Sequence, residues 1–543
     1  MKNLNAMMML PCLAAAVSSC AEAPQEPKPN ILWVMIEDWS TDMGCYGTKG
    51  VETPVMDQLA KEGMLFTNAY TTAPVSSASR SAMMSGFYQN AVHGNQHRLQ
   101  LSEKQPLPEG IKPIPHLMEE GGYMTHIMCW KTDVNYLPAS REDLFVDTRD
   151  WKTRKDGERF FGAKCAPGQP WFARMTFGET HRAWDRDPVD PIATSEVELP
   201  PYYADTDFIR RDWANGLEQL QVVDRMLGEM LQRLEDEGFA DNTIVIFLAD
   251  NGRCHFRGKQ FLYEPGVKVP MIIRWPGKIK PGTVNDTPVV AIDICQTVID
   301  VANVTPKVPL QGLNLFGKEI EEREYIFFAR DKMDDTHDAM RAVRSKSGYK
   351  LIHNLMPERP YMQYNQYKEG GYPPIAEMTY MYLTGQLNEV QSAFFAQTKP
   401  DFELYDLNND PYEIKNLASD PAYDKIEEEL LAALNDWREN VIHDTGVSDT
   451  FRALDVFPKE CPMVSTDAFV HATHDKYDYN VVGWPAWFPT RSAEEWKEIR
   501  DQWVPYLYRE PGTAGKRPPC VADAVVREKA KQARKKAEAA AKK

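Results

Sequence analysis

The chain has 543 residues, more than the ~100–200 residues of one ordinary domain, so two or more compact units are expected. Hydrophobic residues make up 43% and aromatic residues 11%, which excludes a wholly disordered chain. The formal net charge of −17 disfavours a general binder of nucleic acid, because such proteins are usually basic. An anionic ligand then requires a local basic pocket that outweighs the negative electrostatic potential of the whole protein.

The N-terminus has the pattern of a secretion signal. Lys2 precedes a short apolar stretch, and small residues stand directly before Cys20, as in a bacterial lipobox. We predict a signal peptide in residues 1–20, a lipid anchor at Cys20 and a Pro-rich tether in residues 21–29. Cleavage near Ala21–Ala23, which would release a soluble exported protein, is the alternative. We expect the periplasm or cell surface of a bacterium, with membrane contact only through the anchor.

The next segments alternate between strand and helix patterns. An apolar run in residues 28–38 ends in Glu37 and Asp38, which is typical of a buried parallel strand. Thr53 and Pro54 are typical of the N-cap and first residue of a helix. In order, the predicted elements are helices in 53–62 and 110–121, strands in 123–129 and 170–177, a helix in 212–237, and strands in 243–249 and 269–275.

This alternation predicts an α/β fold with a mostly parallel sheet flanked by helices. Polar groups follow several predicted strands, at the edge where such sheets usually bind ligands. After residue 325, short strands in 325–329, 349–353 and 403–407 and a helix in 424–441 predict a smaller α+β C-terminal subdomain. The predicted units are 30–325, 326–510 and a Lys/Ala-rich tail, 511–543, expected to be a solvated helix or disordered.

The nine cysteines do not form a metal or redox motif. No CxxC pair occurs, so a zinc ribbon or a thioredoxin motif is not indicated. Seven cysteines, an odd number, are left when Cys12 in the signal and Cys20 at the anchor are set aside, and one or two disulfides stay open. The remaining cysteines are Cys45, Cys129, Cys165, Cys254, Cys295, Cys461 and Cys520.

A Ser-rich segment is the most informative part of the chain. Residues 71–87 read Thr-Thr-Ala-Pro-Val-Ser-Ser-Ala-Ser-Arg-Ser-Ala-Met-Met-Ser-Gly-Phe and predict a turn that enters a helix near Ser79. Free amides at a helix N-terminus, together with Arg80, form an anion site. By itself this pattern is equally typical of an ordinary Ser-rich helix cap.

Ser76-Ser-Ala-Ser-Arg80 matches the maturation motif of the formylglycine-dependent sulfatases: Cys or Ser, any residue, Pro or Ala, any residue, Arg. Further segments resemble this family, and they occur in the family's order over roughly residues 28–420. They are the opening strand 29–38, Gly44-Cys-Tyr-Gly, Thr53-Pro, the second metal-ligand strand 241–252, the lysine loop 258–270 and Glu403-Leu-Tyr-Asp-Leu-Asn-Asn-Asp-Pro-Tyr-Glu. The resemblance implies an alkaline phosphatase/sulfatase-like fold, closest to the heparan N-sulfatase (sulfoglucosamine sulfohydrolase) branch.

The resemblance also implies a covalent mechanism centred on Ser76. In this family the motif residue is oxidised to formylglycine, whose hydrate attacks sulfur with one oxygen and expels sulfate through the other. A plain serine could attack but could not release sulfate by that route. Because the residue is Ser and not Cys, the implied partner is an anaerobic radical-type sulfatase maturase.

By the same resemblance, Glu37, Asp38, Asp250 and Asn251 align with the calcium ligands of the family. Three carboxylates and an amide oxygen suit Ca²⁺ better than Zn²⁺. Such an ion would acidify the hydrated aldehyde and balance the charge of the sulfate. The family usually has Asp where this chain has Glu37, and the longer side chain keeps the charge but changes the local geometry.

Four further residues are implied to act on the sulfate. Arg80 is expected to hold the nucleophile and the metal ligands, and Lys131 and Lys259 to bind the sulfate. His181 is expected to assist the leaving group with a proton. The family pattern continues with His two residues after the first lysine, and here that position is Asp133.

Other residues are weaker candidates for contact with the substrate. His255 could replace the missing histidine, or be an ordinary loop histidine. His93, with its neighbour His97, could face the sugar, and His337 and Arg341 could close the pocket from the second unit.

These observations favour a sulfatase that hydrolyses an O-sulfate or N-sulfate of a sulfated mono- or oligosaccharide, held in a pocket by its chain end. A first alternative is a phosphatase or phosphodiesterase of the alkaline phosphatase superfamily with unmodified Ser76 and zinc, although no convincing second set of ligands is present. A second alternative is a non-catalytic, glycan-binding lipoprotein whose Ser76 is never matured.

Overall fold

The structure is a computed structural model. The predictions for the signal peptide, for Cys20 and for most of the tether and the tail lie outside the residues that it describes. No described helix is both long and apolar enough to cross a membrane. The described residues are 27–97, 99, 101–155, 158–316, 322–333, 336–363, 365–444, 446 and 492–513, without the side chains of His337, Gln366 and Glu369.

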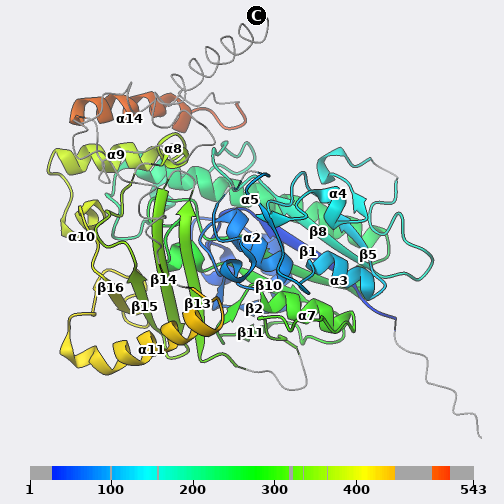
Figure 1. Cartoon of the computed structure of the whole chain (residues 1–543). Helices are drawn as coiled ribbons and strands as arrows, with labels where there is room; N and C mark the ends of the chain where they lie inside the picture. The colour runs from blue at the N-terminus through cyan, green and yellow to red at the C-terminus, as the bar shows by residue number, and fades with distance from the viewer. Residues whose placement is uncertain are drawn as a thin grey trace, which may run out of the picture.

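An eight-stranded sheet forms the centre of the larger part of the molecule (Figure 1). Its strand order is β11-β2-β10-β9-β1-β8-β5-β7, and the central strand β1 is parallel to both of its neighbours. Strand β10 is antiparallel to β9 and β2, so the sheet is mostly parallel, as predicted. The strands are β1 (Asn30–Ile36), β2 (Met64–Phe66), β5 (Met124–Ile127), β7 (Asp147–Thr148), β8 (Trp171–Phe177), β9 (Thr243–Ala249), β10 (Met271–Arg274) and β11 (Thr283–Asn285).

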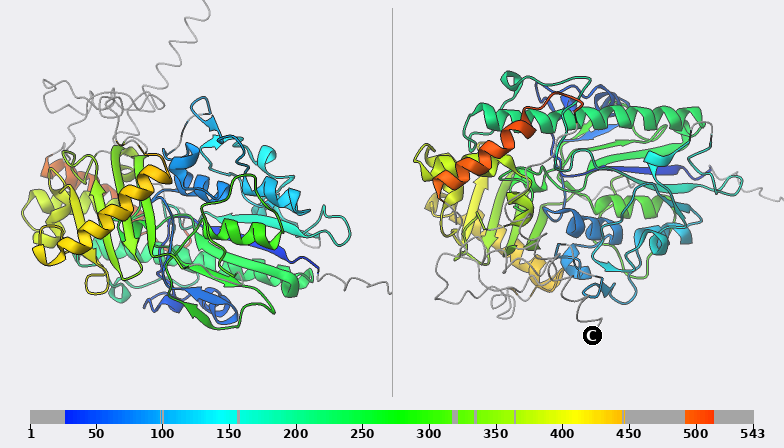
Figure 2. Two further views of the ribbon diagram at one scale, coloured as in Figure 1. Left: turned by 60° about the horizontal axis from the view of Figure 1, so that its bottom comes forward. Right: turned by 90° about the horizontal axis from the view of Figure 1, so that it is seen from above.

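Helices cover both faces of this sheet (Figure 2, right). This explains why β1 and β9 are apolar at nearly every position and buried along their whole length. On one face α5 (Asp207–Asp236) lies beside α1 (Pro54–Glu62). On the other face lie α2 (Ser76–Ser85), α3 (Ile114–Glu120) and α7 (Asp293–Val301), which contact one another.

Two helix starts differ from the sequence-based expectation. Helix α5 begins at Asp207, five residues before the predicted start, because the Thr206 side chain accepts a hydrogen bond from the backbone N–H of Ile209. Helix α2 begins at Ser76 and not near Ser79. The second difference matters for the site, because it places Ser76 in the first turn of the helix.

The C-terminal part contains a four-stranded antiparallel sheet with its strands in chain order, and α11 (Asp424–Asn440) packs along it (Figure 1). The sequence predicted three of these strands and α11, but not β14. It also missed α8 (Gln366–Glu369), α9 (Pro373–Leu383) and α14 (Ala493–Leu507); α9 and α14 pack back onto α5. The strands are β13 (Tyr325–Met333), β14 (Thr336–Ser345), β15 (Tyr349–Asn354) and β16 (Phe402–Asp406).

One hydrophobic cluster joins the two parts, since it contains β1 residues such as Leu32 together with Leu404 of β16 and Trp503 of α14. The fold is therefore the predicted α/β unit with an α+β subdomain built onto it, and the exact domain limits stay predictions. The smaller elements are β3 (Ala69–Tyr70), β4 (Gln105–Pro106), β6 (Tyr136–Leu137), β12 (Val289–Val290), α4 (Arg141–Leu144), α6 (Glu264–Val267) and α10 (Glu389–Ser392).

The cysteines within the described residues are free: Cys45, Cys129, Cys165, Cys254 and Cys295. The disulfides that the sequence left open are therefore not formed among these five. Cys461 and Cys520 lie outside the described residues.

Candidate active site

Three strands end together at one edge of the large sheet. Ile36, the last residue of β1, pairs with Phe177 of β8 and with Ala249 of β9. The residues that follow these strands must therefore meet at this edge. They include the four predicted metal ligands and the segment that carries His181.

The predicted ligands Glu37, Asp38, Asp250 and Asn251 are all buried at this edge. The backbone N–H of Asp38 donates to Asp250 Oδ1 at 2.9 Å, and Asn251 Nδ2 donates to Asp38 Oδ1 at 3.1 Å. Asp38 has φ = 55°, in the left-handed region that non-glycine residues seldom adopt. Such a conformation persists only where the surroundings enforce it, which is common at functional sites.

Ser76 faces this acidic group from the first turn of α2. Its Oγ lies 3.0 Å from Asn251 Oδ1 and 3.4 Å from Asp38 Oδ1. The first backbone N–H groups of a helix have no partner within the helix, so the start of α2 favours a negative charge at Ser76, whereas the carboxylate of Asp38 opposes it. The structure thus brings the predicted nucleophile position against the predicted metal ligands.

Arg80, one helical turn after Ser76, connects the two outer carboxylates. Its Nε donates to Asp250 Oδ2 at 2.8 Å, and its Nη2 donates to Glu37 Oε1 at 3.2 Å. Burial by itself lowers the pKa of this guanidinium, but Asp250 and Glu37 raise it above its usual value. Arg80 therefore stays charged and acts through the carboxylates, because no contact with Ser76 is seen among its hydrogen bonds.

The two predicted lysines lie at different depths. Lys259 is buried, and its Nζ lies 2.7 and 2.8 Å from the two carboxylate oxygens of Asp38. Burial alone raises the pKa of Asp38, yet Lys259 and His181 hold it well below its usual value. Lys131 is partly exposed, and its Nζ lies 3.4 Å from Glu37 Oε1. It also lies over the ring of Trp130, a side chain that is 69% exposed.

His181 presents one ring nitrogen to the site. Its Nδ1 lies 2.6 Å from the carbonyl oxygen of Arg182, which can only accept, so Nδ1 carries a proton in either charge state. Its Nε2 lies 3.7 Å from Asp38 Oδ2. Nε2 is therefore the atom that can give or take a proton at the site.

Asp133 occupies the place where the family pattern has histidine. Its Oδ2 lies 3.4 Å from Lys131 Nζ, and its φ is 62°. A carboxylate at this position lowers the net positive charge at the rim, whereas a histidine could have added to it. The substitution therefore leaves open the proton-transfer role that the resemblance assigns to a histidine at this position.

Tyr367 is a residue of the site that the sequence analysis missed. It lies in α8, and its hydroxyl is 3.1 Å from His181 Nε2 and 3.5 Å from Asp38 Oδ2. Its ring also lies 5.1 Å from Lys259 Nζ. No sequence motif marks Tyr367. It lies in the short helix α8 of the second subdomain, and tertiary packing brings this helix to the sheet edge.

Replacing Tyr367 by Phe is expected to lower kcat/KM about 10-fold, because it removes the hydroxyl that contacts His181 Nε2. The measurement is steady-state kinetics on a substrate that the wild type hydrolyses. Tyr372→Phe is the matched control, because that hydroxyl is buried without a described hydrogen-bond partner and its ring packs on Tyr367. Equal kinetics in the wild type and Tyr367→Phe would show that the contact is only structural.

The donor set fits a calcium ion by its chemistry. It consists of three carboxylates and one carboxamide oxygen, without Cys or His, which matches a hard cation. The carboxylate oxygens here contact Arg80, Lys131 and Lys259. Among the described residues, no three His, Cys, Asp or Glu side chains are grouped so that they could hold a metal ion.

Of the remaining predicted substrate contacts, His255 and Arg341 do not join this network. The His255 ring is buried among Trp39, Trp184 and Trp213, and neither ring nitrogen has a hydrogen-bond partner among the described residues. This burial lowers its pKa well below the usual value. Its surroundings are those of a packing residue, so the structure does not place His255 where the missing histidine would act.

Arg341 is also occupied elsewhere. Its Nη2 lies 2.9 Å from Asp331 and its Nε 2.8 Å from Asp444, both within the second subdomain. His93 is exposed at the end of the 3-10 helix η2 (Gln89–Val92), and the side chain of His337 is not described. The neighbouring His97 is buried, with Nδ1 2.7 Å from Ser77 Oγ.

Buried carboxylates at a sheet edge, a helix-start hydroxyl and surrounding cations define a hydrolase of anionic esters. A family model described as Sulfatase matches residues 29–304, and a model described as N-sulphoglucosamine sulphohydrolase, C-terminal, matches residues 252–397. The chain belongs to the sulfatase family. The predicted family, its heparan N-sulfatase branch, the fold class and the activity of a sulfuric ester hydrolase are thereby confirmed.

Named relatives agree with this assignment. An "Ulvan-active sulfatase" of Formosa agariphila is 30% identical over 461 residues, which cover 78% of this chain and 77% of the relative. The human "N-sulphoglucosamine sulphohydrolase" is 25% identical over 471 residues, 77% of this chain and 91% of the relative. Both support a sulfatase over the phosphatase and the non-catalytic alternatives.

Solved structures show the same fold. A putative sulfatase from Bacteroides thetaiotaomicron has a TM-score of 0.57 at 21% identity and covers 77% of this chain and 93% of its own. A protein solved in complex with its substrate, D-glucosamine-2-N,6-O-disulfate, has a TM-score of 0.55 at 18% identity, with coverage of 77% and 99%. At these identities the likeness concerns the fold alone.

Proposed function

We propose that this protein removes sulfate from a sulfated mono- or oligosaccharide, with Ser76 oxidised to formylglycine and Ca²⁺ held by Glu37, Asp38, Asp250 and Asn251. The observation that carries the proposal is the contact of Ser76 Oγ with Asn251 and Asp38, at 3.0 and 3.4 Å. Formylglycine would supply a nucleophile that can also release the sulfate, and calcium would supply positive charge for it.

The chain's own residues have separate roles in this proposal. Lys131 at the rim and Lys259 at the floor offset the negative charge of the bound sulfate. Arg80 holds Glu37 and Asp250 in place through its hydrogen bonds to both carboxylates. His181 gives a proton to the leaving oxygen or nitrogen through Nε2, because Nδ1 is committed to a backbone carbonyl.

The substrate class follows from the relatives and from charge. The relatives include proteins named for ulvan, for N-sulphoglucosamine and for N-acetylglucosamine-6-O-sulfate, so the shared ligand is a sulfated sugar. A net charge of −17 disfavours binding along a polyanionic chain, and we propose that the end of a glycan enters the pocket. The exposed ring of Trp130, beside Lys131, offers a surface on which a sugar can stack.

Two features of the sequence, the N-terminal segment and the serine of the motif, support further parts of the proposal. The signal and the small residues before Cys20 are those of an exported protein that is lipid-anchored at the periplasmic or outer surface of a bacterium. The serine in the motif calls for an anaerobic radical-type maturase as a partner.

Mass spectrometry of the peptide that contains Ser76 tests the proposal. The protein is produced anaerobically with a serine-type maturase, and the same batch is assayed on a panel of sulfated sugars. A peptide lighter by the mass of H₂ that reacts with a hydrazide, together with sulfate release, is the expected result. An unmodified serine in a preparation that still releases sulfate would contradict the formylglycine mechanism.

Removal of divalent ions tests the proposed calcium site. Treatment with EGTA is expected to lower kcat at least about 10-fold, and Ca²⁺ is expected to restore it where Zn²⁺ does not. Asp250→Asn is expected to raise the Ca²⁺ concentration needed for half-maximal activity. The control is Asp236→Asn, an exposed carboxylate of α5. Full activity after chelation would argue against a required ion.

A further inference from the structure

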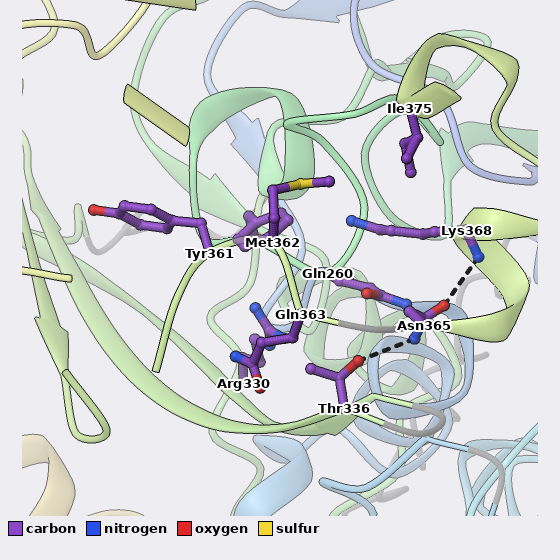
Figure 3. Close-up of a pocket in the computed structure, with 10 residues that line it drawn as sticks. Gln260, Arg330, Thr336, Tyr361, Met362, Gln363, Asn365, Lys368 and Ile375 are labelled. Carbon is purple, nitrogen blue, oxygen red and sulfur yellow. Dashed lines mark hydrogen bonds between the residues drawn. The ribbon is translucent and has the colours of Figure 1, made fainter. Parts of the chain in front are cut away.

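A small polar cavity lies beside the active site, between the loop that follows Lys259 and the second subdomain (Figure 3). Its volume of about 20 Å³ accommodates roughly one water-sized group. Figure 3 shows the side chains of Lys368 and Arg330 approaching from different elements, α8 and β13, with Gln260 and Asn365 between them. The cavity is therefore built by both subdomains.

The lining of this cavity is rich in hydrogen-bond donors. Arg330 is 1% exposed and Gln260 is 2% exposed. Arg330 Nε and Gln260 Nε2 have no hydrogen-bond partner among the described residues. Within the described part of the chain, no Asp or Glu lines the cavity, whereas Lys368 and Arg330 do. Buried donors without partners are costly, and an anion would satisfy them.

Buried cations and buried carboxylates lie together beside the cavity. Arg330 and Lys399 share the carboxylate of Asp338, at 3.6 and 3.0 Å. Asp331 also acts on Arg330, and Glu403 on Lys399, yet burial still lowers the pKa of each cation. The charges of this group are therefore largely compensated, and the inference of an anion rests on the unpartnered donors and on the described lining, which holds no Asp or Glu.

Chain connectivity places the cavity next to the reacting group. Gln260 directly follows Lys259, and its backbone N–H donates to the carbonyl of Pro74, two residues before Ser76, at 2.8 Å. Lys368 directly follows Tyr367, whose hydroxyl contacts His181. Gln260 also has φ = 81°, a strained conformation that packing must enforce.

We propose that this cavity is a second anion subsite, which receives one oxygen of another acidic group on the same glycan. That group is a sulfate or a carboxylate, carried by the sugar that loses its sulfate or by the next ring. Only one oxygen enters, since the cavity holds about one water-sized group and is too small for a sugar. The inference rests on the proposed function and narrows it to glycans with a second acidic group near the scissile sulfate.

Calorimetry on the unmatured protein, which keeps the Ser76 hydroxyl, tests the subsite without turnover. The ligands are glucosamine N-sulfate, glucosamine-2-N,6-O-disulfate, and N-sulfated glucosamine linked to a uronic acid. At least one of the two doubly acidic sugars is expected to bind about 10- to 100-fold more tightly than the N-sulfate, as a charge-assisted contact implies. The disulfate arm reports a sulfate in the cavity, and the uronic acid arm reports a carboxylate.

Lys368→Met and Gln260→Leu are each expected to remove most of this preference, with the affinity for the N-sulfate as the internal reference. Lys307→Met, at an exposed lysine, is the matched control and is expected to keep the preference. Two results would overturn the proposal. One is that the wild type binds all three sugars with equal affinity or binds none of them. The other is that the preference for the doubly acidic sugars survives both substitutions. Sulfate release by the matured enzyme is measured separately, so a failure of the sulfatase function is told apart from a failure of the subsite.

Discussion

Replacing Ser76 by alanine is expected to abolish sulfate release, with a loss in kcat of about 10⁴-fold or more. The side chain is the only group of α2 in contact with Asp38 and Asn251 among the described hydrogen bonds. Without it, no covalent intermediate can form, and removal of a nucleophile costs about this much in well-studied hydrolases. The measurement is kcat on the sugar that the wild type hydrolyses.

Ser79→Ala is the matched control for this experiment. Ser79 lies in the same helix, is buried to the same degree and has a hydroxyl without a described hydrogen-bond partner. Its substitution is expected to leave both kcat and the melting temperature nearly unchanged. Residual activity of Ser76→Ala above about 1% of the wild type would mean that another group attacks the sulfate.

Replacing Arg80 by Met is expected to have the largest effect on stability, a loss of about 3–5 kcal/mol in the free energy of unfolding. The guanidinium is fully buried and bridges Asp250 and Glu37. Its removal leaves two buried carboxylates without their main cation, a cost that the thioether of Met cannot offset. The shift of the urea denaturation midpoint measures this loss.

Two variants separate this effect from a general cost of losing an arginine. Arg80→Lys keeps the charge but cannot contact both carboxylates with a planar fork, so an intermediate loss is expected. Arg210→Met removes an arginine that pairs with Asp205 at the surface, and about 0–1 kcal/mol is expected there. If Arg80→Met is as stable as Arg210→Met, the buried bridge does not stabilise the fold.

The sequence predicted the residues whose position follows from strand order. Glu37, Asp250 and the segment of His181 each follow a buried strand, and strands β1, β8 and β9 are neighbours in register. Parallel strands bring such residues to one edge regardless of loop detail. The role of Arg80 was implied by the resemblance, and its closeness to Ser76 agrees with helix geometry, in which four residues make about one turn.

The residues that the sequence could not predict depend on long-range packing. Tyr367 reaches the site from a four-residue helix whose position is set by the second subdomain. His255 follows Asn251 closely, yet its ring turns into a group of tryptophans that lie far apart in sequence. Arg341 pairs with Asp444, a partner about a hundred residues away. No local pattern carries that information, so residue spacing alone could not predict the surroundings of these side chains.

The complete burial of α2 restricts when Ser76 can be modified. All ten residues of this helix are buried, and Ser76 itself is 3% exposed. A modifying enzyme needs access to the side chain that it oxidises, and the folded protein leaves Ser76 almost wholly buried. The proposed oxidation of Ser76 would therefore have to occur while the chain is still unfolded. Any molecule that folds before Ser76 is oxidised would then stay inactive. The fraction of active enzyme would depend on the relative rates of modification and folding.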